Sequence, residues 1–391
     1  MKLLFVHDHR FVFRGDAVFT STGSFPAAAW SRYLEAFDHV TVVGRAAGPD
    51  VAADGLARSD RHGVAFLSAA SLGTLYGQWR GGGAADLLAE QIAQADAVVV
   101  RLPSELGLRA AAIARRMGKA HAVEVVGCAW DGYRAYGGLK ASLYAPLAYA
   151  RMRQAIARSP FALYVTHYWL QGRYPCHGVT AAASNVEIEL PGPQALAARR
   201  TRLDAIVGGA VPVLGTVGSL AVRYKGVQTA IAALARLKAQ GLTLPYRVLG
   251  AGDLEPWRAM AQAAGVGDQV RFDGVLPPGE AVRGWLDSID IYLQPSFQEG
   301  LPRATIEAMS RGCACIGSTA GGLPELLSPD LTHRPGDVRA LAAAIRRLTD
   351  DPARLAQVSA SNSAGSARFE SATLHARRAA FYGRLRDAAL A

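Results

Sequence analysis

Two glutamates, Glu299 and Glu307, lie where an expected strand leads into an expected helix: Glu299 is in the loop between them and Glu307 is in the helix. The strand is expected at Ile289–Gln294 and the helix at Arg303–Arg311, so the loop between them begins at the carboxyl end of the strand. Its backbone N–H groups and the helix N-terminus favour phosphate or electron-rich sugar oxygens. Gly300 lets a ligand approach the backbone closely, and carboxylates accept hydrogen bonds from sugar hydroxyls. Two lone glutamates are more often solvated surface residues; the residues around them favour a ligand pocket.

The elements that must position this loop follow an alternation of short apolar runs and longer helical stretches, which is typical of βα units on a parallel sheet. In the first half, strands are expected at Lys2–His7, His39–Gly44, Val64–Ser68, Ala97–Arg101, His121–Val126 and Ala162–Thr166, with helices at Phe25–Phe37 and Glu105–Met117. In the second half, strands are expected at Val213–Val217, Tyr246–Leu249, Val270–Phe272, Ile289–Gln294 and Ala314–Gly317. Helices are expected there at Gly226–Ala239, Glu255–Ala264, Gly279–Leu286, Arg303–Arg311, Asp337–Thr349, Pro352–Ser359 and Glu370–Leu390.

The chain has 391 residues and a mass of 41.3 kDa, which suits two domains of ordinary size. Pro191–Ala210 breaks the alternation with Pro-Gly-Pro, Arg-Arg and Gly-Gly, and we interpret it as the linker. The expected domains are therefore residues 1–192 and 193–369, followed by a C-terminal helix over 370–391. Two facing α/β domains enclose a cleft, because ligands bind beyond the carboxyl ends of parallel strands.

Composition excludes several classes of protein. Apolar residues make up 50% of the chain and charged residues 19%, which is incompatible with a disordered chain. Four cysteines without a C-x-x-C pair exclude a disulfide scaffold and indicate a reducing compartment. No apolar run approaches the roughly 18 residues of a membrane span, and the first residues do not resemble a signal peptide. These features predict a cytoplasmic protein, with contact to the inner face of the cell membrane left open.

The net charge of +10 favours anionic partners. Residues 132–186 contain no Asp or Glu, but they contain six basic residues among many aromatic ones. This window is either a solvated basic face or a surface for an anionic acceptor or membrane, where each Lys or Arg near lipid phosphates contributes about 1 kcal/mol. Nucleic acid is not expected, because no helix-turn-helix, zinc-finger or RRM string is present. His7 and His9 could face a metal together, but without a third ligand a loop position facing the cleft is favoured.

The string Glu299-Gly300-Leu301-Pro302-Arg303, with Glu307-Ala308-Met309 and then Gly321-Gly322-Leu323-Pro324-Glu325, resembles the E-x7-E region of retaining GT-B glycosyltransferases, most of all the GT4 family. The resemblance covers roughly residues 213–327. It implies a GT-B fold, α/β in class, in which two Rossmann-like domains face each other across a deep cleft. The N-terminal domain would bind the acceptor and the C-terminal domain the nucleotide sugar, while the last helix would pack back on the first domain.

The resemblance also implies roles for individual residues. Glu307 would bind the ribose hydroxyls of the donor, and Glu299 the transferred sugar near its third hydroxyl. The backbone at Gly300 and Leu301 would contact sugar or phosphate oxygens.

A second string, Gly218-Ser219-Leu220 followed by Lys225-Gly226, is similar to a family pattern that places an arginine and a lysine on the donor diphosphate. Lys225 matches the lysine, but Ser219 stands at the arginine position, and Arg223 is our candidate for the missing charge. Fixed cations stabilise the charge that builds on the departing diphosphate, although such residues are otherwise ordinary solvated charges.

Further binding residues follow from the same resemblance. Gly252 belongs to a glycine loop beside the nucleotide, and Val275 lies where the backbone would line the base. In the first half, Gly23 is the match to the family's glycine pair. The family's mid-domain histidine is absent, and Asp131 is the candidate cleft residue nearby.

The implied activity is retaining, metal-independent transfer of a sugar from a UDP- or GDP-linked donor, without a cofactor. The implied acceptor is a hydroxyl of a growing glycan, such as a polyprenyl-diphosphate-linked oligosaccharide in surface polysaccharide or lipopolysaccharide synthesis. The alternative is a catalytically inactive GT-B protein that binds sugar nucleotides or an anionic surface, because Ser219 and the absent histidine depart from the pattern.

Overall fold

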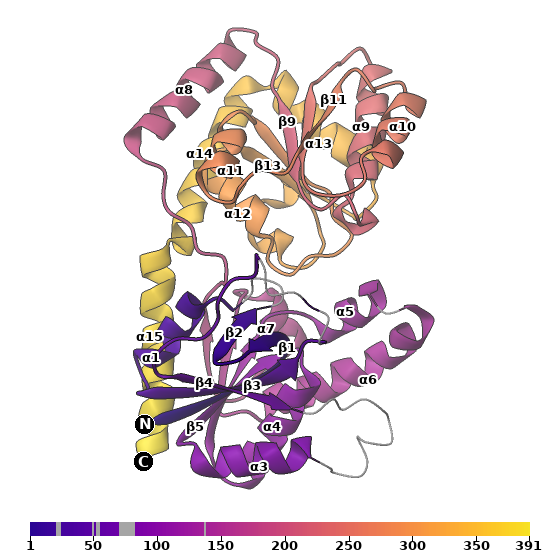
Figure 1. The fold of residues 1–391 in the computed structure, drawn as a ribbon. Coiled ribbons are helices and arrows are strands. Elements are labelled where there is room, and N and C mark those ends of the chain that lie inside the picture. Colours follow the sequence, from indigo (N-terminus) through magenta and orange to yellow (C-terminus); the bar gives the residue numbers. More distant parts are fainter. Residues whose placement is uncertain (21–24, 49–50, 52–54, 70–82, 137) are drawn as a thin grey trace. The chain divides into compact units, whose positions relative to one another are not determined.

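The computed structural model describes residues 1–391 except 21–24, 49–50, 52–54, 70–82 and 137 (Figure 1). The described residues form two compact α/β units. Unit 1 comprises Met1–Asn185 and Leu374–Ala391, and unit 2 comprises Val186–Thr373. The sequence placed the corresponding boundaries after residues 192 and 369.

Unit 1 is built on a sheet whose described strands run in the order β4-β3-β1-β5-β6-β7-β8, each parallel to its neighbours. These strands are β4 (Val64–Ala69), β3 (His39–Ala46), β1 (Lys2–Arg14), β5 (Ala97–Leu102), β6 (Ala120–Val125), β7 (Phe161–Tyr164) and β8 (Val179–Ala182). The order of strands reverses direction between β1 and β5. Their side chains are mostly buried, as expected for a parallel sheet covered on both faces.

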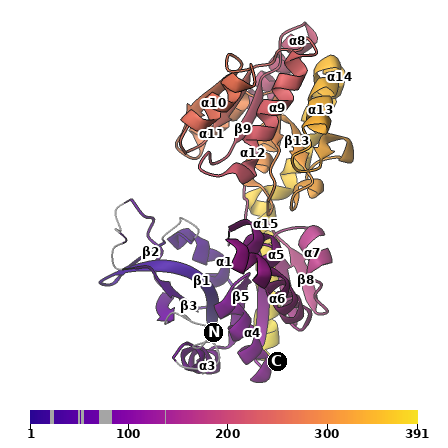
Figure 2. The same cartoon turned by 90° about the vertical axis from the view of Figure 1, so that its right-hand side faces the viewer.

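The helices of unit 1 cover this sheet. They are α1 (Ser31–Leu34), α3 (Ala84–Gln94), α4 (Glu105–Arg116), α5 (Ala129–Tyr136), α6 (Gly138–Ala157), α7 (Trp169–Arg173) and α15 (Ser371–Leu390). The last of these, α15, runs along unit 1 in both views (Figures 1 and 2). Its Phe381 packs edge to face on Phe161, with ring centroids 6.2 Å apart, and its Tyr382 packs on Tyr33 at 5.0 Å. Aromatic burial of this kind attaches the C-terminal helix to the N-terminal sheet.

Two expectations for the first half are wrong. The segment around His7 and His9 is not a loop, because β1 continues to Arg14 and turns back through Gly15 into β2 (Ala17–Thr20), which pairs with it antiparallel. Gly15 has φ 55°, as a tight hairpin turn requires. The helix expected at Phe25–Phe37 is a 3-10 turn at Ala27–Trp30 followed by the short α1.

Unit 2 repeats the same plan with the strand order β11-β10-β9-β12-β13-β14, all parallel. The strands are β11 (Val270–Gly274), β10 (Tyr246–Leu249), β9 (Leu214–Val217), β12 (Ile291–Gln294), β13 (Ala314–Ser318) and β14 (Thr332–His333). This is the strand order of a dinucleotide-binding α/β fold, with the switch point between β9 and β12.

Helices pack on both faces of the sheet of unit 2: α9 (Val227–Lys238) with α10 (Glu255–Ala263) and α13 (Val338–Asp350), and α12 (Arg303–Ser310) with α11 (Glu280–Asp287) and α14 (Pro352–Ser366). The core between them is aliphatic, with Ile231, Leu234, Ile291 and Ile345 essentially inaccessible to solvent. The sheet is therefore a rigid support for the loops at its carboxyl edge.

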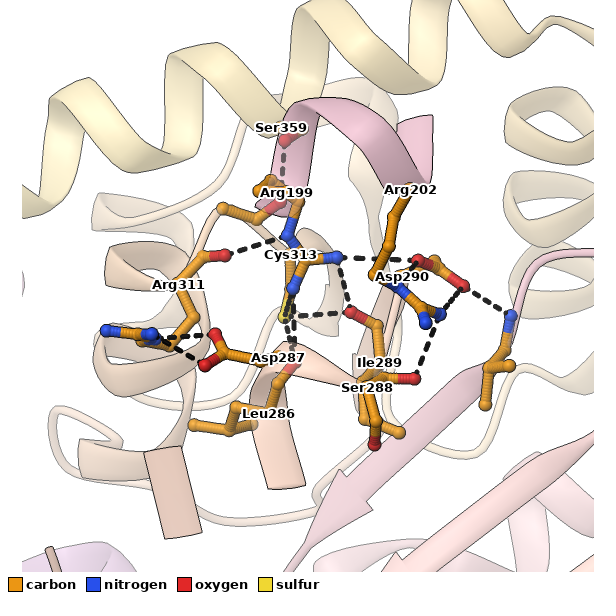
Figure 3. Close-up of polar contacts among 12 residues, drawn as sticks. Arg199, Arg202, Leu286, Asp287, Ser288, Ile289, Asp290, Arg311, Cys313 and Ser359 are labelled. Atoms are coloured by element: carbon orange, nitrogen blue, oxygen red, sulfur yellow. Dashed lines mark hydrogen bonds and ion pairs between the residues drawn. The ribbon is translucent and has the colours of Figure 1, made fainter. Parts of the chain in front are cut away.

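The expected linker, Pro191–Ala210, is mostly the helix α8 (Pro193–Val207; Figure 1), which belongs to unit 2 and whose polar contacts are drawn in Figure 3. Pro193 occupies the first helical position, where its missing N–H is not needed. Arg199 anchors α8: its guanidinium donates to the carbonyl oxygens of Ile289 at 2.7 Å and Arg311 at 2.9 Å, and pairs with buried Asp290. The residues that suggested a linker belong to a docked helix. Pro193 starts it, the Arg199-Arg200 pair contains its anchor, and the Gly208-Gly209 pair follows its last residue.

Candidate functional site

The loop between β12 and α12 places Glu299 at the carboxyl edge of the sheet of unit 2. The Glu299 side chain is only 8% exposed, and three donors converge on its Oε1. Lys225 Nζ donates to this oxygen at 2.8 Å, Ser296 Oγ at 2.8 Å and Gln294 Nε2 at 2.9 Å. The carboxylate is thus held in one orientation by charge and by two neutral donors.

The two neutral donors to Glu299, Gln294 and Ser296, come from alternate positions of β12 and its extension. Tyr292, Gln294 and Ser296 are two residues apart, so their side chains emerge on the same side of β12. Tyr292 OH donates to Gln294 Oε1 at 2.7 Å, which frees the amide nitrogen of Gln294 for Ser296 and Glu299. All three are buried. This polar row was not recognised in the sequence, although its period of two on an expected strand was the available signal.

Gly226 is the position that brings Lys225 to Glu299. It has φ 80°, and a Cβ atom there would lie 2.0 Å from the carbonyl oxygen of Pro295. Phe297 N donates to Tyr224 O at 2.7 Å across the same junction. Only glycine allows this left-handed turn against the neighbouring loop, so the Lys-Gly pair positions the cation through backbone geometry.

Gly321 plays the corresponding part on the other side of Glu299. It has φ 60°, and a Cβ atom there would lie 2.0 Å from the carbonyl oxygen of Glu299 itself. Gly322 N donates to Gly300 O at 2.7 Å. The loop that begins with the two glycines is therefore packed directly on the backbone of the Glu299 loop.

Glu307 lies in the second turn of α12, with a side chain that is 28% exposed. Arg303, one turn earlier, approaches it at 3.7 Å. Burial raises the pKa of Glu307, and Arg303 offsets part of that effect. The structure thus brings Glu299 and Lys225 into contact, whereas Glu307 pairs with Arg303 on the helix that follows.

The remaining residues expected in the second half lie in loops at the same edge. Gly218 N donates to Leu249 O at 2.9 Å, which joins the loop after β9 to the end of β10, and Gly252 lies in the loop after β10. Val275 follows β11 and is 69% exposed. Gly300 and Leu301 are half-buried in the loop before α12.

Arg223 is not brought to Glu299. It is exposed, and the described part of the chain offers its guanidinium no ion pair. Ser219, at the position where an arginine was sought, accepts a hydrogen bond from Ala221 N at 3.3 Å and shapes its own loop. The charge next to Glu299 therefore comes from Lys225.

Unit 1 has a cavity of about 400 Å³ at the carboxyl edge of its own sheet. Its lining is largely apolar, with Asp8, Glu105 and Tyr133 among the described residues that contribute. Asp8 Oδ2 accepts from the backbone N–H groups of Glu105 and Leu106 at the start of α4, and Asp8 Oδ1 pairs with Arg45 at 2.7 Å. The sequence pattern did not indicate that these residues line a cavity. The available signal was that Asp8 directly follows the expected first strand, and in the structure it lies where the pairing of β1 with β3 shifts register.

Asp131, the candidate expected in unit 1, lies in α5 and pairs with Arg173 at 3.5 Å. Gly23 lies outside the described residues. His9 donates to or accepts from Thr20 Oγ1 at 2.8 Å in the β1–β2 hairpin. Among the described residues no group of His, Cys, Asp and Glu has the arrangement of a metal site.

Polar groups in the interior of unit 1 are paired with one another. Glu124 is 3% exposed, pairs with Arg101 at 2.7 Å, and accepts hydrogen bonds from Tyr33 at 2.7 Å and Tyr382 at 2.5 Å. Burial alone would raise the pKa of Glu124, but Arg101 and the two hydroxyls outweigh it and hold that pKa below its usual value. Burial and Arg101 lower the pKa of His7 to about 3 and that of His9 to about 4.

Comparison with known proteins assigns the chain to a family. The model of the family described as "Glycosyl transferases group 1" matches residues 211–351, which include Lys225, Glu299 and Glu307. The protein CapJ of Staphylococcus aureus is 30% identical over 350 residues, which are 89% of this chain and 86% of CapJ. The chain belongs to the glycosyl transferases group 1 family. This confirms the predicted group of glycosyltransferases, whereas the retaining type and the E-x7-E assignment stay predictions.

Other matches cover only part of the chain or only its fold. The amylovoran biosynthesis glycosyltransferase AmsK of Erwinia amylovora is 37% identical over 144 residues, 34% of this chain and 35% of AmsK. The apo structure of the lipopolysaccharide outer core galactosyltransferase WaaB superposes with a TM-score of 0.65 at 15% identity, covering 100% of this chain and 99% of WaaB. The structure of Anabaena Alr3699/HepE in complex with UDP gives 0.65 at 16% identity, covering 96% and 98%. Two Rossmann-like units with these structural neighbours confirm the predicted GT-B fold class.

Proposed function

We propose that this glycosyl transferase moves a sugar, with retention of configuration and without a metal, from a UDP- or GDP-linked donor to a hydroxyl of a growing glycan. The observation that carries the proposal is the contact between Lys225 and Glu299 at the carboxyl edge of unit 2. A cation and an oriented carboxylate side by side, next to the N-terminus of α12, fit the two ends of a sugar diphosphate.

In this proposal Lys225 turns to the diphosphate when the donor binds, where its charge stabilises the departing nucleoside diphosphate. Glu299 stays oriented by Gln294 and Ser296, and accepts a hydrogen bond from a sugar hydroxyl. Glu307 accepts from the ribose. Attack from the front face, with the departing phosphate taking up the acceptor proton, needs no separate general base. Arg223, exposed at the start of the same loop, would reach the diphosphate only after a change of side-chain conformation.

The names of relatives support the choice of product. AmsK is a glycosyltransferase of amylovoran biosynthesis, and the neighbour WaaB is a lipopolysaccharide outer core galactosyltransferase. Neighbouring structures of HepE contain UDP or UDP-glucose. We therefore place the activity in the synthesis of a surface polysaccharide or lipopolysaccharide.

The acceptor is proposed to be a polyprenyl-diphosphate-linked glycan that approaches unit 1. The cavity beside Asp8 and Tyr133 offers a carboxylate and a hydroxyl within a largely apolar lining. Gly23 and Asp131 remain candidates for acceptor contacts. Such an acceptor would bring the protein to the inner face of the cell membrane as a peripheral protein; the helices in the described part of the chain are too short or too polar to cross a bilayer.

Titration calorimetry with UDP, GDP and their sugar conjugates tests the donor site. We expect one nucleotide family to bind, and Glu307→Ala to weaken binding by roughly tenfold or more, as for a lost hydrogen-bonded charge. Glu255→Ala is the matched control, because Glu255 is an exposed helical glutamate of unit 2, with a side chain that is 75% accessible and that pairs with Arg258 on the same helix. Equal effects of the two variants, or no binding by a folded protein, would contradict the donor site.

A catalytically inactive binding protein would bind the donor in the same titration. Release of nucleoside diphosphate with glycan acceptors separates the two, and the anomeric configuration of the product, read by NMR, tests retention. Binding without any turnover would favour the inactive alternative.

A further inference from the structure

Helix α6 presents a row of exposed leucines that the proposed sugar transfer does not use. Leu139, Leu143 and Leu147 are 80%, 74% and 54% exposed. They are spaced four residues apart, so they lie one above another on a single side of the helix. The opposite side of α6 is packed into unit 1 through Ala145, Ala148, Met152 and Ile156. Single exposed leucines are common on protein surfaces, but three in one row form an apolar ridge.

The same side of α6 becomes basic in its second half. Four residues after Leu147 comes Arg151, and Gln154, Ala155 and Arg158 continue this side. Together with α4 they line a cavity of about 230 Å³, to which Arg109, Arg115 and buried His121 also contribute. None of the described residues that line it is an Asp or a Glu. Arg151, which lines the cavity, pairs with Glu105 at 2.9 Å, and Glu105 also accepts a hydrogen bond from Tyr144 at 2.9 Å.

We propose that this face of unit 1, defined by the leucine row of α6 and the basic cavity between α4 and α6, docks on an anionic lipid bilayer. The leucines enter the outer part of the acyl region, and Arg115, Arg151 and Arg158 contact lipid phosphates. The charge of the occupant follows from the cavity, because its described lining holds four arginines and no Asp or Glu, and an excess of cations attracts anions even though Arg151 also pairs with Glu105. Its apolar part follows from the ridge, since a soluble polyanion gains nothing from three leucines.

The depth of this contact is limited by packing. Because the inner side of α6 belongs to the core, only the side chains of the row can leave water, as in an interfacial helix that lies along the membrane plane. Neither the leucine row nor the basic cavity is sufficient by itself for stable binding to a bilayer. Together they give membrane binding that depends on lipid charge and on salt. The docked face belongs entirely to unit 1, so this inference does not depend on the donor site of unit 2.

Vesicle flotation of the full chain tests the proposal, with vesicles of phosphatidylcholine alone and of phosphatidylcholine mixed with phosphatidylglycerol. We expect binding to the anionic vesicles only, and less of it as the Debye length falls from about 10 Å at 0.1 M salt to about 3 Å at 1 M. The double variant Leu139→Ser/Leu143→Ser should bind about tenfold more weakly, because leucine burial in lipid is lost. Arg158→Gln should bind about fivefold more weakly, the loss of one basic residue near lipid phosphate.

Matched controls lie on α15, away from this face. Leu390 is 70% exposed and Arg384 is exposed, so Leu390→Ser and Arg384→Gln repeat the chemical changes elsewhere on unit 1. All variants should keep the wild-type thermal midpoint and the wild-type affinity for nucleotide in the absence of vesicles. A failure of donor binding in the wild-type protein would overturn the proposed function while leaving the flotation result to stand on its own.

Three outcomes would overturn the docking proposal. In the first, the protein binds both kinds of vesicle equally, or the leucine variant binds like its Leu390→Ser control. In the second, a soluble acidic polysaccharide binds with the same loss in both the leucine and the arginine variants, which would make that polymer the partner. In the third, light scattering shows a dimer that Leu139→Ser/Leu143→Ser dissociates, which would assign the ridge to a second copy of this chain.

Discussion

Units 1 and 2 have the same strand order around their switch points and the same edge available for ligands, but they use polar side chains there in opposite ways. In unit 2, Lys225 and Glu299 meet at the carboxyl edge, held in place by loops that touch through Gly226 and Gly321. In unit 1, Asp8 binds the first amides of α4, and Glu124 is satisfied by Arg101 and two tyrosines. In unit 2 the paired charges are the two proposed donor-binding side chains themselves, whereas in unit 1 the charges pair with residues of the surrounding fold.

This difference is what we expect if the proposed donor site lies in unit 2 and the proposed acceptor site in unit 1. In that proposal, unit 2 offers a fixed pattern of charge to the diphosphate of the donor. Unit 1 offers a mostly apolar cavity whose shape depends on residues from several helices, such as Ala129, Tyr133 and Ala141.

The largest effect that would sharpen this comparison is expected at Lys225. Lys225→Met should lower kcat/KM for donor turnover by about 10²–10³-fold, the usual cost of removing one group that stabilises developing charge. Asp131→Asn in unit 1, which removes a half-exposed ion pair with Arg173, should cost no more than about fivefold. Steady-state release of nucleoside diphosphate measures both, and a larger loss in the Asp131 variant would reverse the assignment of the two edges.

A second large effect is expected from the backbone contact at Gly226. Gly226→Ala should destabilise unit 2 by about 3 kcal/mol, because the new Cβ meets the carbonyl of Pro295 and the residue must keep a positive φ. Gly383→Ala in α15 is the control: a Cβ there meets nothing within 4 Å, and alanine should stabilise the helix by about 0.5–1 kcal/mol. Chemical denaturation followed by circular dichroism compares them. Equal midpoints would show that the close contact of the two loops is not required.

Acid should destabilise unit 1 through its buried histidines. The pKa of His9 is lowered to about 4, so between its unfolded value near 6.5 and 4 the unfolded chain takes up a proton that the folded unit does not. Above pH 6.5 His9 is neutral in both states, so the free energy of unfolding is not reduced. As the pH falls below 6.5, His9 lowers the free energy of unfolding by at most about 1.4 kcal/mol per pH unit. His9→Gln should flatten the stability profile of the protein over this range. An unchanged slope between pH 6.5 and 4 would show that His9 is accessible to protons in the folded state.

The smallest effect is expected at Ser296, which touches Glu299 but not the proposed ligand. Ser296→Ala should lower kcat about fivefold, less than the full value of a hydrogen bond to a carboxylate because Lys225 and Gln294 still hold Glu299, while the affinity for the nucleotide alone stays unchanged. A loss of nucleotide affinity equal to the loss of kcat would mean that Ser296 supports the fold of the loop rather than the orientation of Glu299.

The contrast between the units also decides how much of the site could be predicted from the sequence. Gly226, Gly321 and Glu299 were recognisable because they belong to the strings that resemble the family. Where a backbone contact tolerates only glycine, the glycine stands at a fixed position in such a string. Lys225 was found with them, but nothing in the sequence showed that it reaches Glu299 rather than solvent. Arg223 was put forward by proximity in sequence; the structure leaves it exposed, and its part in donor binding stays a prediction.

Elsewhere, tertiary contacts determined what local patterns could not. The parallel α/β pattern was predicted from apolar runs, but the extension of β1 to Arg14 depends on its partner β2. Helix α8 was mistaken for a linker because its anchor, Arg199, binds carbonyl oxygens about 90 or more residues away in sequence. The cavity beside Asp8 was missed for the same reason: its lining comes from three separate segments.

Hydrogen exchange of the full chain with and without the bound nucleotide tests the central claim most directly. The account predicts slower exchange in residues 218–226 and 295–307 of unit 2, and no change in residues 101–108 and 129–136 of unit 1. Protection that appeared in the unit 1 segments and left the Lys225 and Glu299 loops unchanged would contradict the donor site assigned here.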